Sequence, residues 1–382
     1  MFRNNRKIIV FVKNKLMSLD TVIPILLEMK VSYGIHSEIV VLDGMAYNAI
    51  QDNVVLRDIN NNIGSVLFLA KGSKVKILRY INALIPLSKI VIGCIKGDKI
   101  IHFGHLDVFP FKIFSLLFNK NIYRMQGTAY NFDYPVKLQF RKNNPIPVLA
   151  GKNLIICSDD IKNTHFRNTG KEKTIYKIGE TRTRKSWVEY INSKSEYYFS
   201  KYHADVDISS GFIVFILGGI NREFTYNLFL STIEILKLSN NNIPILIKPH
   251  AYTNIDNLNK AIAGLNLFYI TYLHPSLLAS RARVFISNGF SNTFGDAHTY
   301  GVRTIEYVNF TNDDVEYAEL SSEELKIRSK VSVEPKYVDY FINNDSDKLL
   351  KIMREVLDQK YIKSNFKGNI NSDEELFISL LK

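Results

Sequence analysis

Cationic, hydroxyl and glycine residues directly follow apolar runs in the second half of the sequence, a combination suited to holding an anion. Glycine lets a backbone approach a phosphate closely, helix N-termini offer free N–H groups, and a cation or imidazole adds charge. The candidates are Gly218, Gly219 and Arg222 after residues 212–217, Lys248, Pro249 and His250 after residues 243–247, and His274 before Pro275. A tight turn at the glycines and a helix start at His274 are the structural alternatives.

The 287–301 segment is the richest of these stretches. A strand predicted at residues 284–287 enters a hydroxyl- and amide-rich turn, which opens a helix predicted over residues 292–300. Its polar side chains are Ser287, Asn288, Ser291, Asn292 and Thr293. Ser291 or Asn292 can cap that helix, and the free amides predict a phosphate cradle. Asp296 lies about one turn into the helix and Gly301 is expected to end it. Ordinary capping of a core-facing helix is the alternative.

Histidine and carboxylate side chains that could act as a general base follow strands in the first half. We favour His105 and Asp107, after the strand predicted at residues 99–103, and Asp133, soon after Gln126. Other candidates considered are His102, the pair Asp159 and Asp160, and Asp20, for which a helix-capping role is favoured. A carboxylate nucleophile would permit double displacement. We expect a base or nucleophile at this edge of the sheet.

Two series of alternating strand and helix patterns must position these residues. Continuous apolar runs joined by helical segments predict parallel sheets covered by helices, with ligands beyond the carboxyl ends of the strands. The fold class predicted is α/β, with two Rossmann-like parallel-sheet domains facing across a cleft. We place them at residues 1–190 and 191–382, the second with C-terminal helices. Residues 77–95 are interpreted as a helix followed by a strand, because Pro86 and Gly93 break the apolar stretch, and residues 171–203 give no clear pattern.

The composition of this 382-residue chain limits which metals and macromolecular partners we expect it to bind. Cys94 and Cys157, the only two cysteines, lie in apolar runs and predict buried reduced thiols, and no motif suggests a zinc or other metal site. The net charge of +12 comes without a nucleic-acid-binding motif. An anionic membrane surface is the other partner that such a charge suits, with a soluble basic surface as the alternative. The basic residues considered are Lys71, Lys74, Lys76, Arg79, Lys137, Arg141 and Lys142.

Targeting signals do not appear in the sequence. The apolar piece at residues 8–12 is too short for a signal peptide and predicts a first strand instead. We therefore expect a cytoplasmic protein, with peripheral attachment to the inner face of the cytoplasmic membrane as an open alternative. The cationic run at residues 181–185 is interpreted as a solvated linker, with diphosphate binding as the alternative.

The second half of the chain resembles the donor domain of GT-B fold glycosyltransferases over roughly residues 211–310. In that superfamily an acidic residue precedes a small residue, then Gly-x-Pro and a strand. Asp296, Ala297 and Gly301 match this pattern, and Arg303 stands in place of the proline. The Lys248–Pro249–His250 turn and the later serine-rich turn are similar to motifs of bacterial capsule and lipopolysaccharide enzymes, including Kdo-, sialyl- and glycerophosphate-transferring families. Ala251 stands where the first motif would have proline.

The resemblance implies an enzyme that transfers a sugar from a nucleotide-activated donor, CMP- or UDP-linked, to a lipid-linked or growing bacterial surface polysaccharide. The donor would be a substrate, and no further cofactor or metal is implied. Asp296 would contact the sugar or ribose, and the first half would supply the acceptor site and the base. A CDP-glycerol-type glycerophosphotransferase, a nucleotide-sugar epimerase and a non-catalytic glycan-synthesis scaffold are the alternatives.

Overall fold

The computed structural model divides the chain into two compact units, which we describe separately. The first is built from residues within Met1–Asp133, Asn143–Glu189 and Gly368–Lys382, and the second from residues within Tyr134–Lys142 and Tyr190–Lys367. The structure describes residues 6–13, 16–69, 76–108, 111–135, 150–157, 174–218, 223–239, 242–250, 253–310, 321–369 and 374–382.

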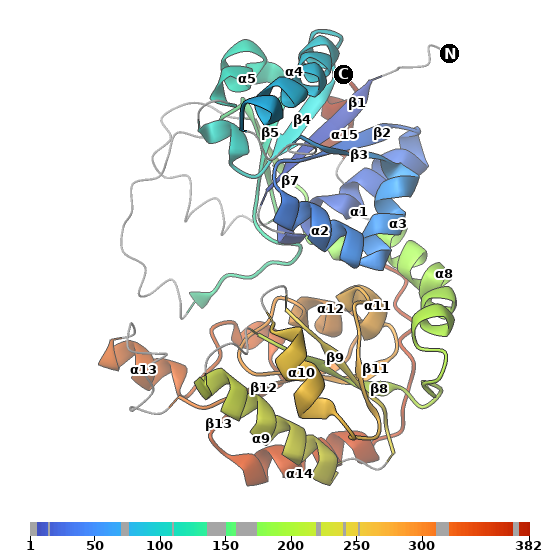
Figure 1. The fold of residues 1–382 in the computed structure, drawn as a ribbon, viewed down its shortest axis with the longest axis vertical. Coiled ribbons are helices and arrows are strands. Elements are labelled where there is room, and N and C mark those ends of the chain that lie inside the picture. The colour runs from blue at the N-terminus through green and yellow to red at the C-terminus, as the bar shows by residue number, and fades with distance from the viewer. Residues whose placement is uncertain are drawn as a thin grey trace. The chain divides into compact units, whose positions relative to one another are not determined.

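The first unit contains a sheet of seven parallel strands in the order β3-β2-β1-β4-β5-β6-β7 (Figure 1). The strands are β1 (Lys7–Val12), β2 (His36–Val41), β3 (Gly64–Phe68), β4 (Lys99–His102), β5 (Ile122–Gln126), β6 (Asn153–Ile156) and β7 (Thr174–Lys177). The helices are α1 (Leu16–Tyr33), α2 (Gly44–Asp52), α3 (Val54–Ile63), α4 (Lys76–Ile95), α5 (Lys112–Leu117) and α15 (Glu374–Leu381). Short 3-10 turns are η1 (His105–Asp107), η2 (Asn119–Asn121) and η3 (Thr181–Thr183).

The second unit contains a sheet of six parallel strands in the order β10-β9-β8-β11-β12-β13. The strands are β8 (Phe212–Ile216), β9 (Ile245–Lys248), β10 (Phe268–Ile270), β11 (Ala282–Ser287), β12 (Arg303–Val308) and β13 (Tyr340–Asn343). The helices are α9 (Glu223–Ser239), α10 (Ile255–Ile262), α11 (Pro275–Ala279), α12 (Phe294–Thr299), α13 (Ser322–Arg328) and α14 (Ser346–Asp358), with η5 at Pro335–Tyr337. Helix α8 (Lys185–Tyr202) precedes the first of these strands.

Buried apolar strands explain both sheets. All five residues of β8 are buried, as are five of the six residues of β1, because strands covered by helices on both faces carry continuous apolar runs. In the second unit Phe215, Phe229 and Met353 belong to one core that α9 and α14 complete. The predicted α/β class with two parallel sheets is therefore confirmed.

The structure revises four interpretations of the sequence. Residues 77–95 form the single helix α4 rather than a helix and a strand, since Pro86 is accommodated inside it. In the unclear stretch at 171–203, the described residues, which begin at Thr174, form β7, η3 and α8. The cationic run is not a solvated linker: Arg182 pairs with Asp20 at 2.9 Å and Arg184 with Glu28 at 2.7 Å, both arginines being buried. Asp20 lies within α1 rather than at its cap.

The C-terminal segment belongs to the first unit, whereas the predicted ranges assigned it to the second. Helix α15 docks there because the Ser379 hydroxyl lies 2.6 Å from the Tyr123 hydroxyl and 2.7 Å from that of Tyr176. Just before it, Asn369 N–H donates to the Thr183 carbonyl at 2.7 Å. Side-chain contacts between residues 203 and 256 positions apart, which local patterns cannot predict, therefore fasten this segment.

Both cysteines are buried and unpaired, as predicted. Burial raises the pKa of each thiol to about 12, so neither is a reactive thiolate near neutral pH. Within the part of the chain that the structure describes, no helix combines the length and apolarity needed to cross a bilayer.

Candidate functional site

The strand order of the second sheet sets the position of its candidate site. The chain begins this sheet at β8, extends it through β9 and β10 on one side, and then returns to β11 on the other side of β8. In open parallel sheets, ligands bind beyond the carboxyl ends of the strands at such a switch point. Gly218 follows β8 here, and Ser287 ends β11, paired in register with Ile216.

The 248–250 turn (Lys248, Pro249 and His250) is fastened to Gly218 by Thr253. The His250 N–H donates to Thr253 Oγ1 at 2.8 Å, and the Thr253 hydroxyl donates to the Gly218 carbonyl at 3.1 Å. The Leu217 N–H also donates to the Lys248 carbonyl at 3.0 Å. Sequence reasoning did not select Thr253, although a hydroxyl three residues after His250 is a signal for such a turn.

His250 is an exposed residue at the carboxyl edge of the second sheet. Desolvation and the positive charge of Lys248 lower the pKa of His250 below its usual value. The ring is therefore neutral near pH 7, and the ammonium group of Lys248 supplies the positive charge of the turn. This pairing suits an anionic ligand with further hydrogen-bonding groups.

The 287–293 turn (Ser287 to Thr293) is anchored to α9 and β12 by hydrogen bonds from Asn288. The Asn288 amide donates to the Thr232 hydroxyl at 2.9 Å and to the Tyr307 carbonyl at 3.3 Å. Gly289 has φ +100°, a conformation that favours glycine, and a Cβ there would meet nothing within 4 Å. The backbone at Gly289 therefore has open space on its Cβ side, as close approach of a ligand requires.

The polar side chains that end this turn already have partners. The Ser291 and Thr293 hydroxyls lie 2.9 Å apart, and Ser291 Oγ accepts from the Thr293 N–H at 3.3 Å. Asn292 Oδ1 accepts from the Tyr134 hydroxyl at 2.6 Å. Helix α12 begins at Phe294, and Thr293 at its N-cap makes no side-chain cap hydrogen bond. Gly301 ends the helix with φ +70°, as predicted.

Asp296 and His274 lie in the interior, each with no exposed surface. Asp296 accepts a short hydrogen bond from the Ser276 hydroxyl, which joins α12 to α11. His274 is the N-cap of α11, where its Nδ1 accepts from the Ser276 N–H at 3.1 Å. In this conformation Asp296 joins two helices and His274 caps one of them, and a ribose or sugar contact for Asp296 stays a prediction.

Glu306 is a buried carboxyl group within β12, only 3% exposed, that the site prediction did not include. It hydrogen-bonds to the Ser332 hydroxyl and to the Phe290 backbone of the 287–293 turn, and Arg328 lies near. Its Oε2 has no hydrogen-bond partner among the described residues. Desolvation raises the pKa of Glu306 to about 7 despite these contacts. The signal in the sequence is an acidic residue inside an apolar strand.

The first sheet has its own switch point, between β1 and β4. His105 follows β4 there, and its ring hydrogen-bonds to the backbone of Phe11 in β1. Burial first, and then the charges of Arg124 and Lys13, lower the pKa of His105 to about 4. Among the described residues, Nδ1 has no hydrogen-bond partner. His105 is therefore a neutral imidazole near pH 7, the protonation state that a general base needs.

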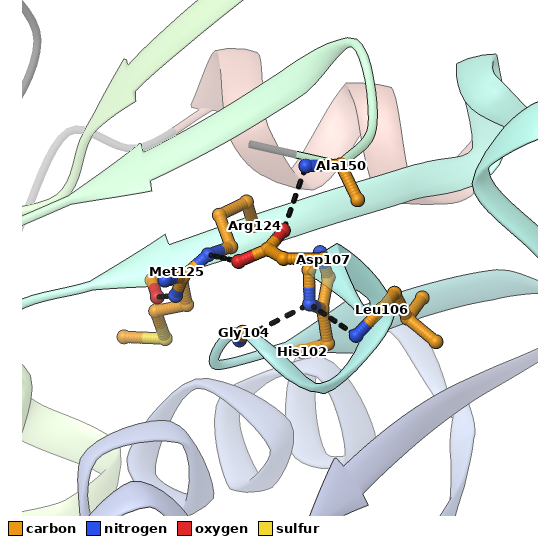
Figure 2. Close-up of polar contacts among 7 residues, drawn as sticks. All are labelled: His102, Gly104, Leu106, Asp107, Arg124, Met125 and Ala150. Atoms are coloured by element: carbon orange, nitrogen blue, oxygen red, sulfur yellow. Dashed lines mark hydrogen bonds and ion pairs between the residues drawn. The ribbon is translucent and has the colours of Figure 1, made fainter. Parts of the chain in front are cut away.

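Asp107 is engaged at both carboxylate oxygens, as Figure 2 shows. Its Oδ2 accepts from Arg124 Nε at 3.0 Å, and its Oδ1 accepts from the Ala150 N–H at 2.7 Å. The same view shows His102 Nδ1 accepting from the Gly104 and Leu106 N–H groups, which shapes the turn that carries His105. These contacts make Asp107 and His102 positioning groups for the 102–107 turn.

Asp133 lies at the end of the first unit's segment, partly buried, and the next residue, Tyr134, donates its N–H to Glu334 at 2.7 Å. Four candidate site residues, Gly219, Arg222, Asp159 and Asp160, lie outside the described residues, as do the basic residues Lys71, Lys74, Lys137, Arg141 and Lys142. Among the residues that the structure describes, no group of three or more histidine, cysteine or acidic side chains is arranged to hold a metal ion.

Comparisons with known proteins identify the fold. No protein-family model matches the chain, and no curated protein matches it by sequence. Among solved structures, UDP-GlcNAc 2-epimerase from Methanocaldococcus jannaschii matches with a TM-score of 0.57 at 15% identity, over 98% of this chain and 99% of that one. The Neisseria meningitidis UDP-GlcNAc 2-epimerase bound to UDP-GlcNAc gives 0.59 at 13% identity, with the same coverage.

UGT89C1 from Arabidopsis thaliana, complexed with UDP, is also similar, with a TM-score of 0.50 at 11% identity over 98% of this chain and 93% of that one. At such identities the likeness concerns the fold. The chain consists of two parallel-sheet units and has the GT-B-like fold that epimerases and glycosyltransferases share.

Proposed function

We propose that the chain is an enzyme acting on a nucleotide-linked sugar, with the nucleotide held at the carboxyl edge of the second sheet. The observation that carries this proposal is the fastening of the 248–250 turn to Gly218 through Thr253, beside the 287–293 turn at the switch point. Solved proteins of this fold are described with UDP or UDP-GlcNAc bound, which supports the same ligand class here.

The proposed roles follow from the chemistry of each group. Lys248 would neutralise a diphosphate, and backbone N–H groups near Gly218 and Gly289 would donate to its oxygens. The neutral imidazole of His250 would hydrogen-bond to the ligand rather than pair with it as a cation. Ser287, Asn288, Ser291, Asn292 and Thr293 would line the same edge, and His274 and Asp296 would support the helices beneath it.

The reaction that we propose first is epimerisation at C2 of a UDP-linked N-acetylhexosamine, the activity named for two of the similar structures. Such a reaction balances if the base takes the C2 proton while the C1–O bond to UDP breaks, which leaves a C1=C2 double bond. UDP then re-forms the bond to C1 as a proton is delivered to the opposite face of C2, so the site needs groups that exchange protons. His105 suits the role of base because it is neutral and half-buried at the first unit's switch point. Asp133 is the second proton-transfer candidate, and Asp107 would keep the 102–107 turn in place.

Glycosyl transfer to a glycan or lipid-linked acceptor is the second candidate function. A specific observation favours it: α4 and α5 expose large apolar side chains, among them Leu84 and Leu116, that an enzyme with a soluble substrate and product does not need. In that reaction His105 would remove the proton of the acceptor hydroxyl. Glycerophosphate transfer from CDP-glycerol differs in the nucleotide, and a non-catalytic scaffold would bind no nucleotide.

A nucleotide screen tests the ligand class. The full chain is melted alone and with UDP, CDP, CMP, GDP or TDP, and a ligand at about 100 times its Kd should stabilise the native state by about 2.7 kcal/mol. A shift with UDP supports the proposal, and a shift with CDP or CMP alone redirects it to the glycerophosphate- or CMP-sugar-transferring alternatives. No shift with any nucleotide contradicts it and favours a scaffold.

Proton NMR in D₂O then separates the two reactions. With UDP-GlcNAc and no acceptor, an epimerase produces the C2 epimer and incorporates deuterium at C2 of the product. A transferase leaves the C2 proton in place, because its chemistry occurs at C1. Unchanged UDP-GlcNAc after long incubation, in a sample that binds UDP, would overturn epimerisation and leave transfer as the candidate.

A further inference from the structure

Helices α4 and α5 present large apolar side chains to solvent. On α4, Leu84, Ile85, Ile92 and Ile95 are between 51% and 71% exposed. On α5, Ile113, Leu116 and Leu117 are between 47% and 74% exposed. Among the described residues, seventeen large apolar side chains are exposed, and seven of them lie on these two helices, which are a small part of the chain. We call them the α4/α5 face.

The two helices form one surface because they pack on the same part of the first sheet. Ile90 and Cys94 of α4 and Phe114 of α5 belong to a single buried cluster with β1 and β4. Asn121 at the end of η2, just after α5, donates its amide to the Cys94 carbonyl at 3.0 Å, which joins the C-terminal ends of the helices. Both lie together at the upper end of the drawing in Figure 1. Their outward faces are therefore neighbours.

Positive charge accompanies the apolar side chains. Lys89, Lys96, Lys112 and Lys120 are exposed on or beside the two helices. Residues 84–120 contain only two acidic side chains, Asp98 and Asp107. Asp98 is 9% exposed and accepts from the Lys7 N–H, and Asp107 is paired with Arg124. The outward face thus combines apolar residues with lysines and carries no exposed carboxylate among its described residues.

Charge decides between two occupants of this face. A second copy of the chain, docked about a two-fold axis, would place the same patch opposite itself and bring lysines against lysines. An anionic lipid surface instead takes up apolar side chains at the boundary of its acyl region and attracts the lysines around them. We propose that the α4/α5 face docks on an anionic membrane surface. This inference does not depend on which reaction the chain catalyses.

Vesicle sedimentation tests the proposal with the full chain. Phosphatidylcholine vesicles with and without phosphatidylglycerol are compared at low and high salt. We expect the chain to sediment with the anionic vesicles at low salt, less so as salt screens the charges, and weakly with phosphatidylcholine alone. The variant L116S/L117S removes apolar area, and K89E/K112E reverses two charges. Each lysine near an anionic surface is worth about fivefold in partitioning, so a loss well above tenfold is expected for the charge variant.

Matched control variants carry the same types of substitution at exposed positions of the second unit. L238S/I362S alters two side chains that are 65% and 80% exposed, and K260E/K351E alters two exposed lysines. Both controls should bind vesicles like the parent chain, and all variants should melt within a few degrees of it. Absence of binding to anionic vesicles, or equal losses in face and control variants, overturns the proposal. A dimer in sedimentation velocity that L116S/L117S dissociates, without vesicle binding, assigns the face to a second copy instead.

Discussion

At the scale of the residue, His105 is the side chain whose surroundings are best suited to proton transfer. Replacing it by glutamine in H105Q keeps a polar side chain of similar size but removes the proton acceptor. General acid–base catalysis contributes about 10²- to 10⁴-fold, so kcat/KM should fall by that range in the NMR or transfer assay. The exposed His36 supplies the matched control H36Q, which should keep parent activity. Parent activity in H105Q would remove His105 from the mechanism.

The pH profile makes a separate prediction about the same residue. The pKa of His105 is lowered to about 4, so the ring is neutral at higher pH and becomes protonated only as the pH falls through about 4. If the ring is the base, the acidic limb of kcat/KM lies near pH 4. A limb near pH 6.5, the ordinary histidine value, would instead indicate an unperturbed histidine.

Glu306 predicts how stability depends on pH. Because burial raises its pKa to about 7, the folded state holds its proton more tightly than the unfolded chain does. The stability that protonated Glu306 contributes is fully present below about pH 4.5, the pKa of this glutamate in the unfolded chain. It is lost as the pH rises through about 7, the pKa in the folded state. The difference in unfolding free energy between E306Q and the parent should therefore shift in favour of E306Q by about 3 kcal/mol over that window.

Chemical denaturation at a series of pH values measures this difference. E323Q, at an exposed glutamate of α13, is the control and should follow the parent at every pH. A constant offset between E306Q and the parent from pH 4.5 to 7.5 would show that the pKa of Glu306 is the same in the folded and the unfolded chain, which would contradict a pKa raised by burial.

Residue roles were only partly predictable from the sequence. The sequence placed His105, Lys248 and the 287–293 turn after strands, because strand ends can be located from apolar runs. Apolar runs do not show how deeply each candidate side chain is buried or which residues it contacts. Asp107 and Asp296 looked like available carboxylates, yet one pairs with Arg124 and the other with Ser276. Thr253 and Glu306 owe their importance to partners distant in the sequence, Gly218 and Ser332 respectively.

At the scale of the element, Gly368 explains how the C-terminal segment joins the first unit. Its φ is +84°, and a Cβ would lie 2.6 Å from the Lys185 Cα and 2.9 Å from the Lys185 nitrogen. G368A should therefore add a backbone clash to the strain of left-handed geometry. Gly264 is the matched control, since its φ is +75° but a Cβ there meets nothing within 4 Å.

We expect G264A to cost about 1–2 kcal/mol of unfolding free energy from left-handed strain alone. G368A should cost a further 1–3 kcal/mol, a typical penalty for overpacking. Urea denaturation of both variants measures the difference. Equal losses would mean that Gly368 and Lys185 do not approach each other as closely as the structure places them.

Element types followed well from the pattern wherever apolar runs were continuous. Strands β1, β8 and β11 were located because each is a run of buried side chains. Helix α4 was divided wrongly because Pro86 and Gly93 were interpreted as breaks, although both lie within the helix. Strand β13 was missed, since this edge strand has an apolar run of only three residues, Tyr340–Ile342, and one buried residue. The docking of α15 depends on contacts with residues more than 200 positions away.

At the scale of the whole molecule, two parallel-sheet units with a shared GT-B-like fold account for the distribution of candidate residues. Each unit places its candidates at the carboxyl edge of a switch point, His105 in the first and the 248–250 and 287–293 turns in the second. The fold class could be predicted because alternation of strand and helix is a property of the entire chain. The reaction could not, since the same fold serves more than one chemistry.

The central claim is that the second unit's switch point holds a nucleotide, and calorimetric titration with UDP tests it most directly. The parent chain should bind UDP, and K248A/H250A should bind it at least tenfold more weakly, since a hydrogen bond to a charged group is worth about 1.5–3 kcal/mol. The control K260A/H36A, which removes one exposed lysine and one exposed histidine that are not part of this turn, should bind like the parent. UDP affinity that is unchanged in K248A/H250A, or absent in a folded parent chain, would contradict the account.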